Sequence, residues 1–477
     1  MPEKAYLSPL SYSSEETLYP HLSFEELSDI DLFGSQRTIV TDFPDFAPFY
    51  AQSEEALIRH DSITDEKGPA DDDRPPDGGL RAWLVVLGGF LAYFATFGLL
   101  NTFGTFQSYY QRNLLPDMSG SVISWIGSLQ IFFLFIGGMV IGPLYDSYGA
   151  RPLIIPGSLV YILSLMFTSL STKYYQLMLA QGVMFGIGNA MLFYPTISSI
   201  TQWFDSCRGL ALGIAVSGSS LGGICWPLLI QYLLDHIGFG WATRITGFIC
   251  VGLLTPSCWL IASRPVSAHS RQNSEPPPKL DFVAILKDWK YTVFSAGMFF
   301  VLWGMFIPFF YLPTYGQAHG MNESAANNLL AYLNAGSLVA RVVTGFIADR
   351  FGRFNAMFGC ALGCGILLFA LYGITSIAAI IAFAVLYGIF SGGLISLQSA
   401  CIAQITPDHR IIGVKIGIMM AICSFGGLTG SPIGGALITV DHGGFTGLIA
   451  FSAVILTAGG FLVLLARFMA APKLRVF

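Results

Sequence analysis

Arg341 is the residue whose type and position point most directly to binding chemistry. It lies about 13 residues into the apolar run Asn328–Ile347, which is long enough to span a membrane. A charged side chain costs at least ~2.5–3.5 kcal/mol at the centre of a bilayer, which makes it a functional candidate by default. A guanidinium can hold a carboxylate through two parallel hydrogen bonds, so the functional interpretation is an anion site. Two structural roles stay open: the side chain can extend to the membrane surface or hold the loop at Asp349.

Neutral polar side chains inside the apolar runs are the second group of candidates. A buried amide or hydroxyl in a membrane seeks a partner, so each of them either faces a solute or joins two helices. The candidate binding residues are Arg341, Asn101, Ser337, Asn334, Gln181, Tyr194, Tyr311 and Gln398, with Gln130 and Asn189 in the same polar set. Aromatic residues make up 14% of the chain, which favours an amphipathic organic ligand over an inorganic ion.

Metal, enzyme and nucleic-acid chemistry are not predicted. Most of the 8 cysteines lie inside apolar runs, and none forms a CxxC or Cys/His pattern suited to a metal. No cluster of nucleophile, base and metal ligands gathers at one end of the runs, so we expect neither an enzyme nor a cofactor. No basic patch indicates nucleic-acid binding.

The apolar runs themselves determine the class of protein. Hydrophobic residues make up 53% of the chain and charged residues 11%, against about 25% charged in soluble domains. A run of about 20 apolar residues crosses a bilayer as a helix, and the sequence predicts an all-α membrane protein with twelve transmembrane helices. The runs are Ala82–Phe106, Val122–Leu144, Pro152–Leu170, Leu177–Ile200, Leu210–Leu234, Trp241–Ala262, Tyr291–Tyr315, Asn328–Ile347, Ala356–Ile374, Ala378–Cys401, Ile411–Leu437 and Phe445–Phe468.

Basic residues in the connections predict the orientation of these helices. Lys and Arg gather in alternate connections, and because cytoplasmic loops are basic, both termini are expected in the cytoplasm. Only Arg112, Lys173 and Arg244 fall near the opposite face. The sequon at Asn322 lies in a loop that this topology places outside, so Asn322 is a candidate glycosylation site. We expect an integral protein of the plasma membrane.

An internal duplication divides the helices into two groups of six. Gly142–Arg151 and Gly345–Arg353 share the pattern Gly-x-x-x-Asp-x-x-Gly followed by arginine, and their aspartates are 203 residues apart. Later, Arg208…Pro227 resembles Arg410…Pro432 at a similar offset. Duplicated bundles are typical of secondary transporters, whose binding site lies between the halves near the middle of the membrane.

The linker between the groups and the composition of the ends predict five segments. Residues 1–76 are predicted to form a disordered, acidic cytoplasmic tail with no signal peptide. The chain from Met1 to Asp77 has net charge −13, and the remainder has net charge +8. The other predicted segments are a first six-helix bundle at 77–264, a cytoplasmic linker at 265–290, a second bundle at 291–468 and a cytoplasmic tail at 469–477.

The repeated loop pattern resembles the loop motif of the major facilitator superfamily. The resemblance covers essentially the whole chain after Pro76 and implies the major facilitator fold. In that superfamily these loops brace the inward-closed state through ion pairs. The resemblance therefore implies gating roles for Asp146, Arg151, Asp349, Arg350 and Arg353, although the same basic residues also follow from the orientation of the helices.

Two further stretches resemble fungal members of the monocarboxylate transporter family. They are Pro76–Trp83, with its Asp-Gly-Gly entry to the first helix, and Trp203–Gly218. The resemblance implies organic acids as substrates, often moved with a proton. At the positions where animal members have a lysine and an aspartate, this chain has Asn101 and Ser337, while Arg341 matches. Fungal relatives with such changes often export secondary metabolites or take up other solutes, so monocarboxylate specificity does not follow.

The sequence therefore predicts a secondary transporter of a small organic molecule, either a monocarboxylate-like acid or a secondary metabolite, by alternating access. The alternative is a membrane sensor on the same fold. No Asp, Glu or His lies deep in any apolar run, although a proton relay usually needs one. Either groups at the helix ends couple a proton, or the solute carries its own proton, or transport is uncoupled. The expected partners are the solute, with or without a proton, and the lipid bilayer.

Overall fold

The computed structural model describes residues 78–204, 208–263, 282–406 and 411–471. The predicted tail at 1–76, most of the predicted linker and the last six residues lie outside this described part. The described residues form helices and short connections, and every predicted apolar run coincides with helices except at the breaks and at one or two residues of some ends. The predicted boundaries of the five segments stay predictions.

The first half contains six spans, of which the first and the second are interrupted, the second at Gly137. The first span is broken twice, near Thr96 and Asn101. Gly238, with φ 76°, separates the fifth span from the sixth, since only glycine adopts this backbone conformation without strain. The helices are α2 (Leu80–Ala95), α3 (Phe97–Leu100), α4 (Phe103–Tyr109), η2 (Tyr110–Leu114), α5 (Gly120–Ile136), α6 (Gly138–Tyr148), α7 (Arg151–Leu170), α8 (Tyr174–Leu177), η3 (Met178–Met184), α9 (Phe185–Trp203) and α10 (Arg208–Leu260).

The second half repeats this order and begins with a short helix that the sequence did not predict. Its seventh span is broken at Phe306. The helices are α12 (Phe282–Lys287), α13 (Trp289–Met305), α14 (Ile307–Ala318), α15 (Glu323–Phe351), α16 (Arg353–Ala370), η4 (Leu371–Gly373), α17 (Ile377–Ile405), α18 (Ile412–Val440) and α19 (Thr446–Ala470).

The helices of the described part agree with twelve spans. Nine helical stretches are long and apolar enough to cross a membrane, and the bent pair α5 and α6 makes a tenth. The long helix α10 counts once in that number although Gly238 divides it into two spans. The eighth span, α15, has 29 residues and is less apolar because it contains charged residues such as Arg341. The predicted all-α fold of twelve helices in two bundles is confirmed.

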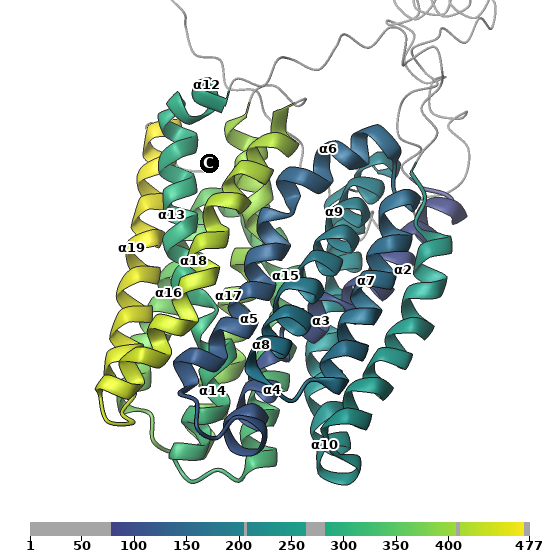
Figure 1. Cartoon of the computed structure of the whole chain (residues 1–477). Helices are drawn as coiled ribbons and strands as arrows, with labels where there is room; N and C mark the ends of the chain where they lie inside the picture. The colour runs from purple at the N-terminus through teal and green to yellow at the C-terminus, as the bar shows by residue number, and fades with distance from the viewer. Residues whose placement is uncertain (1–77, 205–207, 264–281, 407–410, 472–477) are drawn as a thin grey trace, which may run out of the picture. The chain divides into compact units, whose positions relative to one another are not determined.

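The helices run between two faces of the molecule (Figure 1). We call one end the linker face, where α2 begins at Leu80, α10 ends at Leu260 and α19 ends at Ala470. The opposite end is the loop face, which contains the turn at Gly238 and the end of α14 at Ala318. Each half of the chain forms one bundle, and the two bundles meet along what we call the seam.

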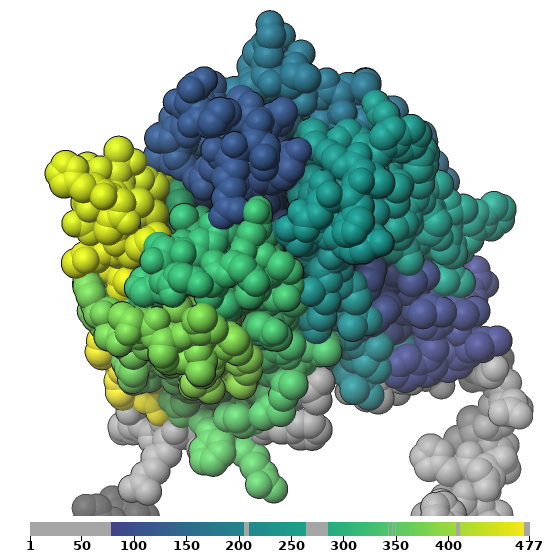
Figure 2. Space-filling view, turned by 90° about the horizontal axis from the view of Figure 1, so that it is seen from below, coloured from purple at the N-terminus to yellow at the C-terminus, as the bar shows by residue number. Residues whose placement is uncertain are grey.

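Two helix pairs form most of the seam: α5 of the first half packs on α18, and α10 packs on α15. Between these pairs, α4 packs on α14, and the rings of Phe103 and Phe310 lie 5.2 Å apart. Viewed onto the loop face, the first half, in blue to teal, and the second half, in green, meet side by side (Figure 2).

Candidate functional site

Arg341 is buried in α15 and part of its guanidinium has no partner. The side chain is 6% exposed, and Nε donates to Ser337 Oγ at 3.4 Å, one turn earlier in the helix. Nη1 is buried and has no hydrogen-bond partner in the described part of the chain. A buried cation without acceptors is costly, so this geometry favours an anionic ligand as the missing acceptor.

Arg341 faces the interior of the molecule. On α15, Val339, Val343 and Ile347 are 57%, 45% and 42% exposed, and their spacing places them on one outward face. Arg341 and Gly345 lie on the opposite side of the helix. Gly345 is nevertheless exposed, and a Cβ placed on it would meet no atom within 4 Å. Open space therefore lies beside Arg341 on the side of the linker face.

Asn334 and Asn101 close this space on the side of the loop face. Asn334 lies two turns before Arg341 on the same side of α15. Asn101 Nδ2 donates to Asn334 Oδ1 at 3.2 Å, and Asn334 Nδ2 donates to the Leu330 carbonyl at 2.8 Å. Gly223 of α10 lies against the same amide, where a Cβ would come within 2.3 Å of Oδ1. The first, fifth and eighth spans therefore meet in a polar floor beneath Arg341.

Asn101 is placed in this floor by a break in the first span. The Asn101 N–H still donates to the Phe97 carbonyl, but from Thr102 the bonds tighten, with Thr102 N–H donating to the Leu99 carbonyl, so Asn101 lies at the break between α3 and α4. The break between α13 and α14 at Phe306 follows Thr102 by 204 residues, close to the offset of the repeated loop pattern. Helices interrupted at matching positions of two repeats are typical of a substrate site between the repeats.

Side chains from both halves seal the loop face. Arg112 Nη1 lies 2.5 Å from Glu323 Oε2, and the same guanidinium donates to the Gln317 side chain. Between α10 and α15, the amide of Asn327 donates to Gln231 Oε1. These contacts connect the ends of the first, fifth, seventh and eighth spans and close the loop face between α10 and α15 in the described part of the chain.

The second pair of seam helices is sealed at the same end. Ser121 Oγ at the start of α5 donates to the Pro432 carbonyl of α18 at 2.6 Å. Tyr311 of α14 donates to the Ser431 carbonyl at 2.9 Å. Gly435 allows this approach, because a Cβ there would lie 2.3 Å from the Tyr311 hydroxyl. Small residues let the backbones of neighbouring membrane helices approach closely.

Near the linker face α6 still packs on α18, but the side of α18 that faces the seam has open space beside it. Gly413, Gly417, Gly427 and Gly435 recur at helical spacing along one side of α18. A Cβ on Gly427 or Gly435 would clash with the first half, whereas one on Gly413 or Gly417 would meet no atom within 4 Å. Gly142 of α6 is equally free. The seam is closed at the loop face and open at the linker face, which is the side on which space reaches Arg341.

The predicted gating residues lie at the open end. Asp146, Arg151 and Arg350 are exposed, and Arg353 is half-buried. Asp146 and Arg151 make no ion pair within the described part of the chain. The Asp349 side chain lies outside the described residues. Since the predicted ion pairs brace the linker face when it is closed, an open linker face leaves their gating role a prediction.

Some of the other predicted binding residues form hydrogen bonds between helices, whereas others form none in the described part of the chain. Gln181 accepts a hydrogen bond from Tyr110 at 2.6 Å within the first half, and Tyr194 donates to the Phe135 carbonyl at 3.0 Å. Gln398 is half-buried on α17. Asn189 is fully buried, and neither polar atom of its amide has a partner in the described part. Arg341, Ser337, Asn334 and Asn101 are the set that the structure brings together.

Two contacts of the site region were not anticipated from the sequence. One is the Gln231–Asn327 pair of the loop-face seal. The other is an ion pair at the linker face, in which Lys415 Nζ of α18 lies 3.0 Å from Asp288 Oδ2, with the lysine 5.1 Å from the centre of the Tyr291 ring. In the sequence, each of these residues is only an amide or a charge near the end of an apolar run. Such a position does not indicate which residue it will contact.

Comparison with known proteins supplies independent information on the family. The sequence profile described as Major Facilitator Superfamily matches residues 85–385 and 329–476. These two matches overlap and together cover nearly all the described helices, including both halves of the seam.

Several similar proteins from fungi match most of the chain. The MFS-type transporter pynF of Aspergillus niger is 62% identical over 397 residues, which are 83% of this chain and 91% of the relative. The Aspyridones efflux protein apdF of Emericella nidulans is 43% identical over 390 residues, 81% of this chain and 78% of the relative. The Agnestins efflux protein AgnL12 of Paecilomyces divaricatus is 40% identical over 387 residues, 81% of this chain and 87% of the relative.

Proposed function

The chain belongs to the major facilitator superfamily. We propose that it exports a secondary metabolite that carries an anionic group. It is an integral membrane protein and a secondary transporter of small organic molecules, which works by alternating access. Relatives named for efflux of aspyridones and agnestins support a secondary metabolite as substrate and export as direction.

The unpaired guanidinium of Arg341 is the observation on which the anionic group rests. Its Nη1 is buried and has no hydrogen-bond partner among the described residues, and open space lies beside it on the linker side. A carboxylate or an acidic enol in that space would accept from Nη1, while Ser337 orients Nε. Asn101 and Asn334 offer neutral hydrogen-bonding groups to the rest of the molecule. The monocarboxylate resemblance agrees with such an acid but does not define its skeleton.

The orientation of the protein makes export the natural direction in this proposal. Basic connections favour a cytoplasmic linker face, with both termini inside and the plasma membrane as location. The described conformation would then admit a cytoplasmic solute to Arg341. Closure of the linker face and opening of the loop face would release it outside.

Proton coupling through an acidic group in the membrane is not part of the proposal. Apart from Asp349, whose side chain is not described, the aspartates and glutamates of the described helices lie near helix ends, such as Asp146 and Asp235. The substrate's own acid group can take up or release the proton, in which case a pH gradient acts on the substrate. The transporter then needs no titrating side chain of its own.

Transport by purified protein in liposomes tests the role of Arg341. Labelled aromatic and aliphatic acids are compared with their methyl esters. In Arg341→Gln we expect acid transport to fall about 10- to 150-fold, because a hydrogen bond to a charged group contributes ~1.5–3 kcal/mol. Ester transport should change little. Arg341→Lys keeps the charge without the paired geometry and should be intermediate.

Arg350→Gln is the matched control, because it removes an exposed arginine from the same helix. It should leave the ratio of acid to ester transport unchanged. If Arg341→Gln lowers acid and ester transport equally, the arginine only stabilises the protein and the anion site is wrong. A pH gradient applied in a parallel experiment determines whether transport is coupled to protons.

A further inference from the structure

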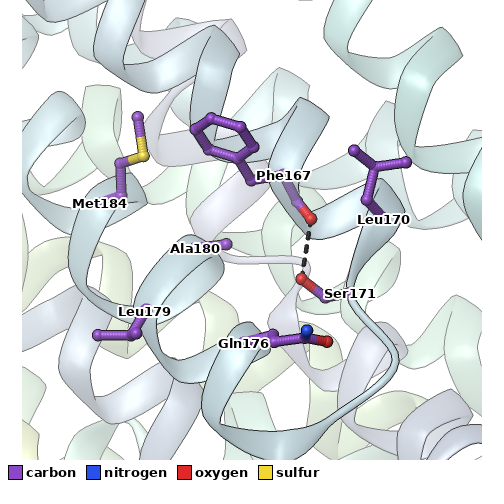
Figure 3. A pocket seen from close by; sticks show the side chains of 7 residues that line it. All are labelled: Phe167, Leu170, Ser171, Gln176, Leu179, Ala180 and Met184. Carbon is purple, nitrogen blue, oxygen red and sulfur yellow. Dashed lines mark hydrogen bonds between the residues drawn. The ribbon is translucent and has the colours of Figure 1, made fainter.

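A crevice lies on the flank of the first bundle, away from the seam. It has a volume of about 330 Å³ and lies between the end of α7 and the start of the fourth span, α8 and η3. Figure 3 shows the side chains around it, with the Ser171 and Gln176 side chains at one end. The lining residues are Phe167, Leu170, Ser171, Gln176, Leu179, Ala180 and Met184.

The walls of the crevice are apolar and open outward. Leu170, Leu179 and Phe167 are 64%, 61% and 50% exposed, respectively. They belong to helices that cross the membrane, so the surface that they expose borders lipid rather than water. The crevice is therefore filled from the bilayer, and its walls suit a hydrocarbon chain.

A local change of helix type forms one wall of the crevice. The fourth span is a π-helix from Met178 to Met184, which contributes Leu179, Ala180 and Met184 to the lining. Such segments are rare and are often found at functional sites. The corresponding span of the second half, α17, is α-helical from Ile377 to Ile405. The π-segment is thus a feature of one half and not a consequence of the repeated fold.

The mouth of the crevice is polar and lies at the loop face. Ser171 Oγ donates to the Phe167 carbonyl at 2.8 Å, which leaves its lone pairs available. Gln176 Oε1 accepts from the backbone N–H groups of Thr172 and Lys173 at 2.9 and 3.0 Å. This arrangement fixes the Gln176 amide and leaves its Nε2 as a donor at the mouth of the crevice.

Lys173 places a positive charge at the same mouth. It is one of three basic residues at the loop face, where the orientation rule disfavours them. Arg112 is paired with Glu323, and Arg244 donates to Ser169 and lies 5.1 Å from the centre of a tryptophan ring. Lys173 is exposed and has no acidic partner within the described part of the chain. A phosphate headgroup at the membrane surface would complement this charge.

We propose that this crevice binds one phospholipid from the leaflet at the loop face. An acyl chain lies between Phe167 and the π-segment, and the lipid phosphate accepts from Gln176 Nε2 and pairs with Lys173. Because the crevice is separate from the seam, this site does not depend on the proposed substrate. A bound lipid would fix the end of the third span against the fourth while the bundles move.

Photo-crosslinking in liposomes tests the proposal with a defined probe, phosphatidylcholine that carries a diazirine in its acyl chain. The full-length protein should be labelled within residues 167–184, and unlabelled phosphatidylcholine should compete. Lys173→Gln should lower this labelling by up to about fivefold, the factor that corresponds to the ~0–1 kcal/mol of one exposed ion pair. Ala180→Leu, which fills the crevice, should lower it by a similar factor or more.

Ala382→Leu on α17 is the matched control, because it adds the same atoms to an exposed alanine of the corresponding span. It should leave labelling within residues 167–184 unchanged. Equal labelling of all variants would show unspecific lipid contact and overturn the proposal. So would labelling of the crevice by a diazirine sterol in place of phosphatidylcholine. Transport and thermal unfolding of each variant verify that the protein is folded.

Discussion

The loop-face and linker-face ends of the seam are built from the same helices but are in opposite states. At the loop face, α10 and α15 are joined by Gln231 and Asn327, and α5 is joined to α18 by the bond from Ser121 to the Pro432 carbonyl. At the linker face, a Cβ placed on Gly142 or Gly417 would meet no described atom within 4 Å. From this difference we expect a small rotation of one bundle against the other to exchange which end is closed.

The interactions at the closed end are individually weak. A neutral hydrogen bond contributes about 0.5–1.5 kcal/mol and an exposed ion pair about 0–1 kcal/mol. A few such contacts seal the loop face, so a substrate that binds the two states with a difference of a few kcal/mol can shift the equilibrium. The glycines at the open end leave room for an equally close contact when the linker face closes.

The largest effect is expected where a side chain blocks closure of the open end. A Cβ placed on Gly417 meets no described atom within 4 Å, so we expect Gly417→Phe to fold and insert normally. The ring would occupy the open space beside α18 at the linker face and block closure of that face, so transport should fall about 100-fold because one state is lost. Liposome transport measures this effect.

Gly359→Phe on α16 is the control, because Gly359 is also exposed and free of neighbours but lies outside the seam. It should transport normally. Normal transport by Gly417→Phe would mean that the open space beside Gly417 does not close during transport, which would contradict alternate closure of the two ends.

A larger side chain at the closed end should shift the equilibrium between the two conformations toward the one that is open at the loop face. In Gly435→Val, the added atoms would come within 2.6 Å of Ser121 Cα, so the contact must open. Overpacking costs about 1–3 kcal/mol, which corresponds to a shift of about 5- to 150-fold toward the loop-face-open state. Labelling of a cysteine placed at Ser121 should become faster to the same extent.

The amide pair between α10 and α15 should have a moderate effect. Asn327→Ala removes a donor to Gln231 at a buried position, which should weaken the seal by about 1 kcal/mol and raise the open population about fivefold. Hydrogen exchange of the loop-face helix ends reports this change. Unaltered exchange would show that the pair does not contribute to the seal.

The smallest effect is expected at the rim of the closed end. Arg112 and Glu323 have side chains 37% and 40% exposed, so their ion pair contributes only about 0–1 kcal/mol. Glu323→Gln should change transport less than about fivefold, and the difference should vanish at high salt because exposed charges are screened. A large effect that persists in salt would contradict a rim position.

The fold could be predicted from the sequence because its signals are local. Each apolar run is read within about 20 residues, and the paired loop patterns at Asp146 and Asp349 revealed the duplication. Arg341 stood out because charge inside an apolar run is rare. Its neighbours Ser337 and Asn334 follow from helical spacing alone. This much of the site required no knowledge of how the helices pack.

The remaining features depend on packing between distant segments. The contact of Asn101 with Asn334 joins residues 233 positions apart, and no local pattern indicates it. The break in the seventh span at Phe306 is explained by Pro308, which lacks the N–H that would bond to the Gly304 carbonyl. The breaks in the first span at Thr96 and Asn101 have no proline beside them, and no local pattern indicates them. Neighbouring helices likewise decide which amides form contacts, as Gln181 does, and which have no partner in the described part of the chain, as Asn189 does.

Paired distance measurements at the two ends test the central claim most directly. Spin labels are placed at Asn113 and Ser324 across the loop face, and at Ser147 and Gly413 across the linker face, all exposed positions. The account predicts that during turnover the loop-face distance lengthens while the linker-face distance shortens, and that Gly417→Phe abolishes both changes. Distances that lengthen or shorten together, or that stay constant in an active transporter, would contradict it.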